Sequence, residues 1–326
     1  MSFDPLEKLG PVVIEGDGDL SRVCDLVEDL LSHHDGLIFQ RGGVLCRVVE
    51  GGSRIGGLSR DPAAPRIVQL DDLSFCDLAT RRIEFQRRNR KTMHLVACDC
   101  PRNVAQTILS RKEWDFPTLR VVVEHPIMLP TGQVLWEDQF HVETGVLLKL
   151  PFCEFQTPVD HPSDHDLQAS LELLLGLLDG FDFVSDTDKS VALAFLMTPF
   201  VRAAIPTAPG FAISAHAAGS GKSTLGRIAA RMSTGRDPAF MTFRDDPVEL
   251  AKIIFAALLE GDQQIAIDNI DVPVSGAELA VILTSPMYRG RVLGQSATAT
   301  VPTNVVLSMN GNNLEIRGDL TRRVVV

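Results

Sequence analysis

Short apolar runs alternate with amphipathic stretches through the second half of the chain. The apolar runs predict buried strands at 211–214, 240–243, 264–268 and 304–309. Apolar residues at helical spacing predict helices between them, at 222–232, 246–259 and 275–284. Strands that alternate with helices are typical of a parallel sheet covered on both faces. Residues 206–326 are therefore expected to form an α/β domain of three layers.

The first half of the chain has a mixed pattern, which we interpret as a small α+β domain over residues 1–150. Strands are predicted at 12–15 and 119–123, and helices at 19–31, from 73 onward, and at 101–111. Hairpins are predicted at 37–49, around Gly42-Gly43, and at 125–136, around Thr131-Gly132. Glycine and proline between them predict a loop at 51–65.

A linker and helical segment, 151–205, is expected to join the two domains. Prolines and polar turn residues in 137–163 predict the crossing between domains. Two apolar helices follow, at 167–178 and 187–204, the second after the N-cap pair Ser185-Asp186. Both are predicted to pack ahead of the sheet.

Arg81–Lys91 is a dense basic run, with six basic residues in eleven. The helical pattern that begins at Leu73 continues into it, so we predict that it ends a helix. One interpretation is a solvated helix end, because cations are favourable near a helix C-terminus. The other is a patch that contacts the phosphate backbone of a nucleic acid. Phe85 is the one aromatic residue within the run, and both interpretations stay open.

Composition narrows the class of protein. The 326 residues suggest two domains, and 45% hydrophobic and 22% charged residues are typical of a globular protein. A formal net charge of −11 excludes a basic nucleic-acid coat, so any such contact must be local. Residues 1–10 lack the apolar core of a secretory leader, and no apolar segment is long enough to span a membrane. We expect a cytoplasmic protein without membrane partners.

The six cysteines are expected to be reduced thiols, as in cytosolic proteins. Cys98-Asp99-Cys100 invites a metal site, but it lacks the C-x-x-C spacing of zinc sites and no second pair accompanies it. A zinc site is therefore not predicted.

Phe211–Thr224, FAISAHAAGSGKST, carries the strongest chemical signal. A buried strand leads through small residues into a helix N-terminus, a setting that binds anions. Glycines let successive N–H groups point into one concavity, the lysine adds a charge for the β- and γ-phosphates, and the serine hydroxyl can ligate Mg²⁺. The predicted phosphate loop comprises Gly219, Ser220, Gly221, Lys222, Ser223 and Thr224. The fingerprint also asks for glycine at position 216, where this chain has His216.

A second motif, Ile265–Asn269, ends a predicted strand in a carboxylate. We expect this strand to deliver Asp268 beside Ser223, so that the two can share one hydrated Mg²⁺. One strand–helix unit separates the motifs, which is typical of NTPases with an additional strand in the sheet. Together the motifs predict binding of ATP with Mg²⁺. Asn269 stands where many ATPases have a glutamate, and an amide cannot act as a base, so Asp271 or a residue of another strand would have to help.

Polar residues that follow the next predicted strand could sense the γ-phosphate. Asn310 and Asn312 are both candidates, and Asn312 is preferred because Gly311 places it just beyond the strand. Arginines near the end of the chain could complete the site of a neighbouring subunit by stabilising charge on the transferring phosphoryl group. The candidates are Arg289, Arg291, Arg322 and Arg323.

The motifs HAAGSGKST, IAIDN, RVLG and NGNNLEIRGDLTRR, in this order, resemble those of helicase superfamily 3 and the virus-type primase–helicase ATPases of phages, prophages and mobile elements. The upstream stretches QRGGVLCRVV and LPTGQVLWEDQFHVETGVLL are similar to the domain that precedes that motor. The resemblance implies an AAA+-like P-loop NTPase that forms hexameric rings and hydrolyses ATP to translocate on DNA. It implies single-stranded DNA as substrate and a primase or another replication protein as partner.

By this resemblance, Lys222 and Ser223 bind phosphate and Mg²⁺, Asp268 is the Walker B acid, Asn312 is the sensor, and Arg322 or Arg323 is the arginine finger. Relatives continue beyond the arginine pair, so 206–326 is expected to be a shortened form of the motor. Two other functions use the same loop. Asn269 favours a regulator or assembly factor that binds ATP and hydrolyses it weakly, whereas the leading α+β domain argues against a small-molecule kinase.

Overall fold

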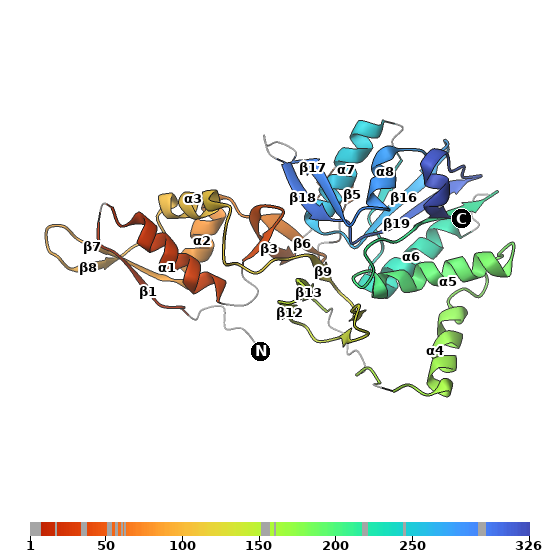
Figure 1. Cartoon of the computed structure of the whole chain (residues 1–326), viewed down its shortest axis with the longest axis horizontal. Helices are drawn as coiled ribbons and strands as arrows, with labels where there is room; N and C mark the ends of the chain where they lie inside the picture. The colour runs from red at the N-terminus through yellow and green to blue at the C-terminus, as the bar shows by residue number, and fades with distance from the viewer. Residues whose placement is uncertain are drawn as a thin grey trace. The chain divides into compact units, whose positions relative to one another are not determined.

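The computed structural model describes residues 8–16, 18–33, 38–50, 54–55, 58–59, 61, 63–150, 157–159, 161–216, 221–243, 246–292 and 298–326 (Figure 1). Tertiary contacts group them into two compact units. Unit 1 holds the described residues of 1–49, 67–120 and 142–145, and unit 2 those of 50–66, 121–141 and 146–326. The units do not follow the predicted segments 1–150, 151–205 and 206–326, because residues after 120 pack with the second half. Ala203, for example, packs on the apolar cluster around Val121 and Leu148.

Unit 1 surrounds one apolar core with three helices and small sheets. The helices are α1 (Leu20–Ser32), α2 (Asp72–Arg82) and α3 (Arg102–Arg111). One sheet has the order β1 (Pro11–Ile14), β7 (Glu84–Arg88), β8 (Leu95–Ala97). A second sheet has the order β2 (Phe39–Arg41), β3 (Val44–Glu50), β6 (Pro65–Gln69). The predicted first strand, the helices at 19–31 and 101–111, and the hairpin at 37–49 are confirmed.

The prediction that a helix continues through Arg81–Lys91 is wrong. α2 ends at Arg82 and strand β7 begins at Glu84. β7 pairs in parallel with β1, and Phe85 is buried opposite Val12. Pairing with a strand far earlier in the chain overrides the local helical pattern, as tertiary context often does.

Unit 2 begins with short strands. β4 (Arg54–Ile55) and β5 (Leu58–Ser59) pair within the stretch that was predicted as a loop. β9 (Val121–Val123), β13 (Val146–Leu148) and β12 (Phe140–His141) form a three-stranded sheet, with β13 in the middle. β10 (Ile127–Met128) and β11 (Val134–Leu135) form the hairpin predicted around Thr131-Gly132. Gly132 has φ of +85°, which favours glycine.

Two helices precede the large sheet of unit 2, α4 (Asp164–Gly176) and α5 (Asp186–Val201). α5 starts at the predicted N-cap Ser185, whose hydroxyl accepts the N–H of Asp188, and it buries Phe195 and Leu196. α4 forms as predicted but buries none of its residues, and Leu173 is 74% exposed. The prediction that α4 packs in the core is therefore wrong for the described part of the chain, because Leu167, Leu171 and Leu173 are exposed and Leu174 and Leu175 are only half-buried.

A five-stranded, all-parallel sheet forms the centre of unit 2. Its order is β15 (Phe240–Thr242), β16 (Gln264–Ile270), β19 (Val306–Asn312), β14 (Gly210–Ala215), β20 (Val324–Val325). The flanking helices are α6 (Lys222–Thr234), α7 (Pro247–Glu260) and α8 (Ala277–Ile282), followed by the 3₁₀ helix η1 (Gly318–Arg322). β19 lies between β14 and β16 in the sheet, and β15, the strand that separates the two motifs in the sequence, lies at the edge beside β16.

The sheet is covered on both faces, as predicted. Neighbouring residues of a strand point to opposite faces, and neighbours in β14 and β19 belong to different apolar clusters. Ala212 and Leu307 pack in the cluster that contains residues of α7 and α8. Phe211 and Val306 pack in the cluster that contains residues of α5 and α6. Figure 1 shows the same arrangement of helices about β16 and β19. The three-layer α/β prediction is confirmed at this level.

Helix ends in unit 2 follow the local chemistry of the sequence. Asp246 caps α7 by accepting the N–H groups of Val248 and Glu249. Gly235 and Gly261 follow α6 and α7 with positive φ, as helix C-caps commonly do. Among the described residues, none of the helices combines the length and the apolar character that crossing a membrane requires.

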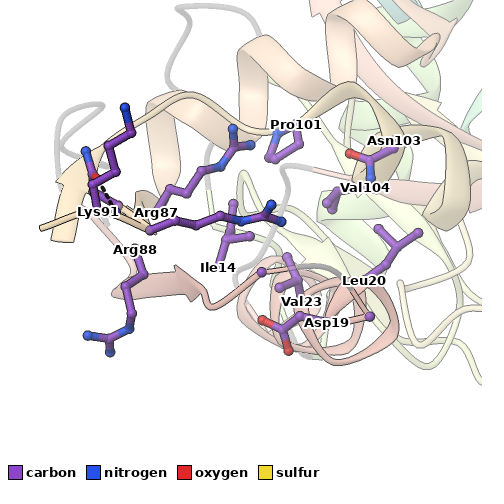
Figure 2. A pocket seen from close by; sticks show the side chains of 14 residues that line it. Ile14, Asp19, Leu20, Val23, Arg87, Arg88, Lys91, Pro101, Asn103 and Val104 are labelled. Carbon is purple, nitrogen blue, oxygen red and sulfur yellow. Dashed lines mark hydrogen bonds between the residues drawn. The ribbon is translucent and has the colours of Figure 1, made fainter. Parts of the chain in front are cut away.

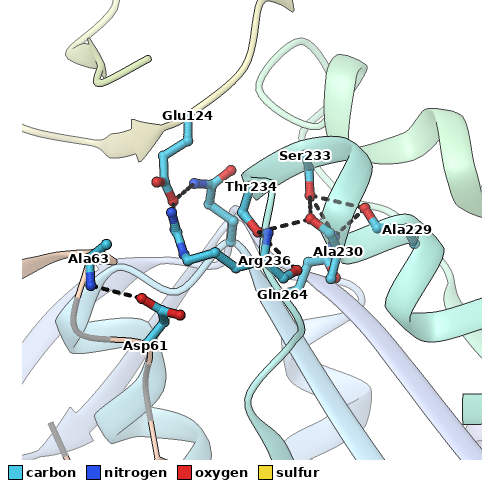
Figure 3. A network of polar contacts seen from close by, with 10 residues as sticks. Asp61, Ala63, Glu124, Ala229, Ala230, Ser233, Thr234, Arg236 and Gln264 are labelled. Atoms are coloured by element: carbon cyan, nitrogen blue, oxygen red, sulfur yellow. Dashed lines mark hydrogen bonds and ion pairs between the residues drawn. The ribbon is translucent and has the colours of Figure 1, made fainter. Parts of the chain in front are cut away.

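A buried polar network connects Glu124, near the start of unit 2, with the C-terminal end of α6 and the N-terminal end of β16 (Figure 3). Glu124 is 5% exposed and accepts a hydrogen bond from Arg236 at 2.5 Å and one from Gln263 at 3.3 Å. Gln264 donates to the carbonyl of Ala229 and to the hydroxyl of Ser233 on α6. Burial raises the pKa of Glu124, and its hydrogen bond with Arg236 opposes that rise. The network fixes α6 against β16.

Candidate functional site

The start of α6 lies beyond the carboxyl end of β14, as the phosphate-loop motif predicts. Gly221 is the N-cap residue of α6 and has φ of +85°, a conformation that favours glycine. A Cβ atom there would also lie 3.0 Å from the ring of Phe181. Lys222, Ser223 and Thr224 form the first turn of the helix. The predicted loop residues Gly219 and Ser220 lie outside the described residues.

The two predicted motifs meet at one point. The Ser223 hydroxyl donates toward both carboxylate oxygens of Asp268, at 3.3 and 3.2 Å. Asp268 is half-buried and lies near the end of β16, opposite Thr242 of β15. The expected juxtaposition of a hydroxyl and a carboxylate is therefore present.

The backbone after Asp268 is irregular. The register between β16 and β19 shifts between Ile267 and Ile270, and Asn269 has φ of +57°. The Asn269 N–H donates to a carboxylate oxygen of Asp268 at 2.9 Å, while its side chain is exposed. Asparagine adopts this conformation more readily than glutamate does, which gives a local reason for the amide at this position.

A cavity of about 490 Å³ lies at the carboxyl ends of the parallel strands, where α/β proteins commonly bind ligands, and candidate residues line it. α6 and the ends of β16 and β19 supply its lining: Gly221, Lys222, Ser223, Thr224, Asp268, Asn269, Ile270, Asp271, Asn310, Gly311 and Asn312. Asp271, the alternative base considered from the sequence, is exposed within it.

Asn310 and Asn312 both line the cavity but differ in environment. Asn312 is the last residue of β19 and is exposed. Asn310 is 1% exposed, and neither its amide nitrogen nor its amide oxygen has a hydrogen-bond partner. A buried side-chain amide without partners is costly and marks a place where a ligand or water completes the bonding. The structure thus favours Asn310 over the preferred candidate Asn312 as the residue that meets a ligand.

His216, at the position where the fingerprint asks for glycine, has a structural partner. Its Nδ1 lies 2.7 Å from Oδ1 of Asn313, just after β19. Among the described non-glycine residues, positive φ occurs at Met93, Lys112, Asn269 and Asn313, so His216 does not need the freedom of glycine. The Ser214 hydroxyl accepts the N–H of Leu314 nearby. These contacts hold the segment after β19 to the end of β14.

The arginines near the end of the chain lie apart from the residues that line this cavity. Arg322 and Arg323 both pair with Asp319 of η1, the latter at 2.5 Å, and Arg322 is exposed. Arg289 and Arg291 lie on β17 (Met287–Arg291), which pairs with β18 (Thr298–Pro302) in a hairpin that was not predicted. Both are exposed there.

The donor set fits a magnesium ion better than a softer metal. Mg²⁺ takes hard oxygen ligands and commonly keeps one or two protein ligands beside phosphate oxygens and water. The hydroxyl of Ser223 and the carboxylate of Asp268 are such ligands. No cluster of three or more His, Cys, Asp or Glu side chains suited to a metal occurs among the described residues, and Cys98 and Cys100 are free thiols.

Comparisons with known proteins leave the family open. No protein-family model matches the chain, and no curated protein matches it significantly.

Sequence reasoning found the two motifs and named Asn310 as a candidate, but it ended the strand at Met309 and did not predict that Asn310 is buried within the strand. The run Val305 to Met309 could have indicated a strand that continues through Asn310, since a polar residue inside a buried strand calls for a partner. No local signal indicated the contact between His216 and Asn313.

Proposed function

We propose that the chain binds ATP with Mg²⁺ at this cavity and hydrolyses it, as a P-loop NTPase of the AAA+-like type. The apposition of Ser223 and Asp268 at the start of α6 carries the proposal. The order of the parallel strands, with β19 between β14 and β16, supports it.

Each residue of the site has a chemical role in this proposal. The first turn of α6 presents backbone N–H groups and the positive end of the helix to the phosphates, and Lys222 adds an ammonium charge. Ser223 and Asp268 would hold Mg²⁺, which neutralises charge on the phosphate oxygens when it is bound. Asn310 would donate its amide to the γ-phosphate or orient the attacking water. Asp271 is the carboxylate in the cavity that could accept the proton of that water.

We further propose that hydrolysis drives movement on single-stranded DNA within a ring of subunits, as in the replicative helicases of phages, prophages and mobile elements that the motifs resemble. The hairpin β17–β18 supports this proposal. Tyr288 packs on Phe255 of α7, and Gly290 lies so close that a Cβ atom there would be 2.5 Å from the Phe255 ring. The alternate residues Arg289 and Arg291 are exposed, and a short segment connects the hairpin to β19 and Asn310. Binding of DNA phosphates at the hairpin could therefore be coupled to the ATP site through this short segment.

A second candidate is an ATP-binding regulator or assembly factor with weak hydrolysis. Asn269 favours it, because this exposed amide occupies the position after Asp268 where a basic carboxylate would activate water.

The two candidates are separated by measuring ATP turnover with and without single-stranded DNA. The motor requires turnover that DNA raises and that Lys222→Ala abolishes, with Arg289→Gln/Arg291→Gln losing the DNA stimulation alone. Tight ATP binding with negligible turnover in the assembled protein would select the regulator, and absence of ATP binding would refute both.

A further inference from the structure

A cavity in unit 1 is lined by part of the basic run, which the proposed ATP site does not use. The cavity has a volume of about 900 Å³ and lies between the β7–β8 hairpin and the first turns of α1 and α3 (Figure 2). Four of its lining residues are cations, namely Arg87, Arg88, Arg90 and Lys91, and one is a carboxylate, Asp19.

The structure divides the basic run into two parts. Arg81 and Arg82 end α2, where Arg81 pairs with Asp77 at 3.0 Å. These two match the interpretation as a helix end. The remaining four cations lie on β7 and in the turn after it, and they line the cavity. Local positive charge is therefore concentrated here in a protein whose net charge is −11.

Strand geometry directs one of these cations over the cavity. Phe85 and Arg87 are two residues apart on β7, so both side chains point to the same face. Phe85 is buried in the core of unit 1, opposite Val12, whereas Arg87 lies opposite Ile14 at the end of β1 and is exposed. The same face of β7 thus carries an apolar side chain in the core and a cationic side chain at the cavity.

Two acidic residues beside the cavity, Asp19 and Glu15, form ion pairs with arginines. Asp19 accepts hydrogen bonds from Arg22 at 2.5 and 2.6 Å and from the N–H of Glu15 at 3.0 Å. Glu15 in turn accepts from Arg88 at 2.6 Å. These hydrogen bonds lower the pKa of both carboxyl groups and keep them ionised and paired. Among the described residues, these two carboxylates therefore pair with Arg22 and Arg88 and not with Arg87 or Lys91.

Two further features suit a polyanion with apolar groups along it. Residues of the first turns of α1 and α3 line the cavity, and neither helix has a side-chain cap for its first N–H groups. Met93, Leu95 and Val96 of the hairpin are exposed by 61%, 44% and 52% beside the cations. Unstacked bases of a single strand can lie against such apolar side chains while the cations contact its phosphates.

We propose that this cavity of unit 1 binds the phosphodiester backbone of a single-stranded polynucleotide, through Arg87 and Lys91. It is a second contact surface, separate from the ATP cavity and from the hairpin β17–β18. The choice of polymer rests on the proposed motor function, but the site itself rests on the charge and shape of unit 1.

The test is equilibrium binding of a labelled oligothymidylate by the full chain, without nucleotide, over a series of salt concentrations. The double variant Arg87→Gln/Lys91→Gln is expected to bind about tenfold more weakly at low salt. Its slope of log K against log salt should fall by about 1.4, because each lost phosphate contact removes about 0.7 for a single strand. The matched control is Arg81→Gln, a residue of the same run that pairs on α2 away from the cavity, and it should bind like the unchanged protein.

Unchanged affinity and slope in the double variant would overturn the inference, as would a loss seen instead in Arg289→Gln/Arg291→Gln alone. Inorganic phosphate or ATP that displaces the oligonucleotide at equal phosphate concentration would also overturn it, by assigning the cavity to small phosphates. Titration of the same double variant with ATP and Mg²⁺ should match the unchanged protein. Failure of ATP binding throughout would count against the proposed function and leave the oligonucleotide result standing.

Discussion

The hydroxyl of Ser223 and the carboxylate of Asp268, 45 residues apart in the chain, lie 3.2–3.3 Å apart in the structure. Ser223 lies in the first turn of α6, which follows β14 and has the N-cap Gly221, and Asp268 lies near the end of β16, two places from β14 in the sheet. Parallel strands make this meeting possible because they bring their carboxyl ends to one edge.

Asn310 is expected to matter more for ATP hydrolysis than Asn312. Asn310→Ala removes a buried, unpartnered amide that lines the cavity and should lower kcat by about 10- to 1000-fold, as loss of a positioned polar group does. Asn312→Ala, at an exposed position of the same cavity, is the matched control and should stay within about threefold of the unchanged protein. Steady-state turnover at saturating ATP measures both. Equal losses, or a larger loss in Asn312→Ala, would return the sensor role to Asn312.

Gly311 is expected to tolerate no side chain, because β16 and β19 approach closely there. A Cβ atom at this position would lie 2.5 Å from the carbonyl oxygen of Ile270. Gly311→Ala should therefore destabilise the protein by about 1–3 kcal/mol and weaken ATP binding by shifting β16. Gly226→Ala on α6 is the control, since its nearest neighbour would be 3.8 Å away and alanine favours a helix by about 0.5–1 kcal/mol. Urea unfolding compares the two, and equal stability would contradict the close approach.

Arg322 and Arg323 are expected to act on a neighbouring subunit rather than on their own ATP site. The pair is held by Asp319 and does not line the cavity of its own chain. Lys222→Ala alone and Arg322→Ala/Arg323→Ala alone should each lack turnover. Mixing them should restore part of it, because some interfaces then join an intact lysine to intact arginines. Mixtures without any activity, or arginine variants with normal turnover, would remove the arginines from the mechanism.

The sheet of unit 2 was predictable because its strands are buried on both faces and read as short apolar runs, such as Ile265 to Ile267. Elements that form through contacts with residues far away in the sequence were not predictable. β7 is a strand because it pairs with β1, and the hairpin β17–β18 depends on the packing of Gly290 against Phe255. Neither contact has a local signature in the sequence.

The candidate site shows the same limit. Lys222, Ser223 and Asp268 were found from motif spacing, which reflects chemistry within a few residues. The environment of Asn310 depends on how far β19 extends beside β14, where Asn310 lies opposite Ile213. Pattern reasoning ended this strand at Met309, three residues too early, and therefore placed Asn312 beyond the strand and preferred it.

His125 is expected to make the protein less stable as the pH falls. Burial lowers its pKa from the ordinary value of 6.5, against the opposing effect of its hydrogen bond with the carbonyl of Pro126. Below about pH 6.5 the unfolded chain takes up a proton at this ring before the folded chain does, so stability is lost as the pH falls toward the folded pKa. The loss is up to about 1.4 kcal/mol for each pH unit in that window.

His125→Phe keeps a ring of similar size against Phe200, whose centroid lies 4.8 Å from that of His125, and removes the titration. Its unfolding free energy should depend less on pH between about 5 and 6.5 than that of the unchanged protein. Identical pH slopes in urea unfolding would mean that His125 titrates alike in both states.

Calorimetric titration with ATP, with and without Mg²⁺, measures whether Asp268 helps to hold a Mg²⁺ ion beside bound ATP. Mg²⁺ should tighten ATP binding in the unchanged protein and in Asp319→Asn, whose carboxylate lies on η1, and Asp268→Asn should lose this gain. Absence of binding heat in the folded, unchanged protein, or an undiminished Mg²⁺ effect in Asp268→Asn, would contradict the proposal.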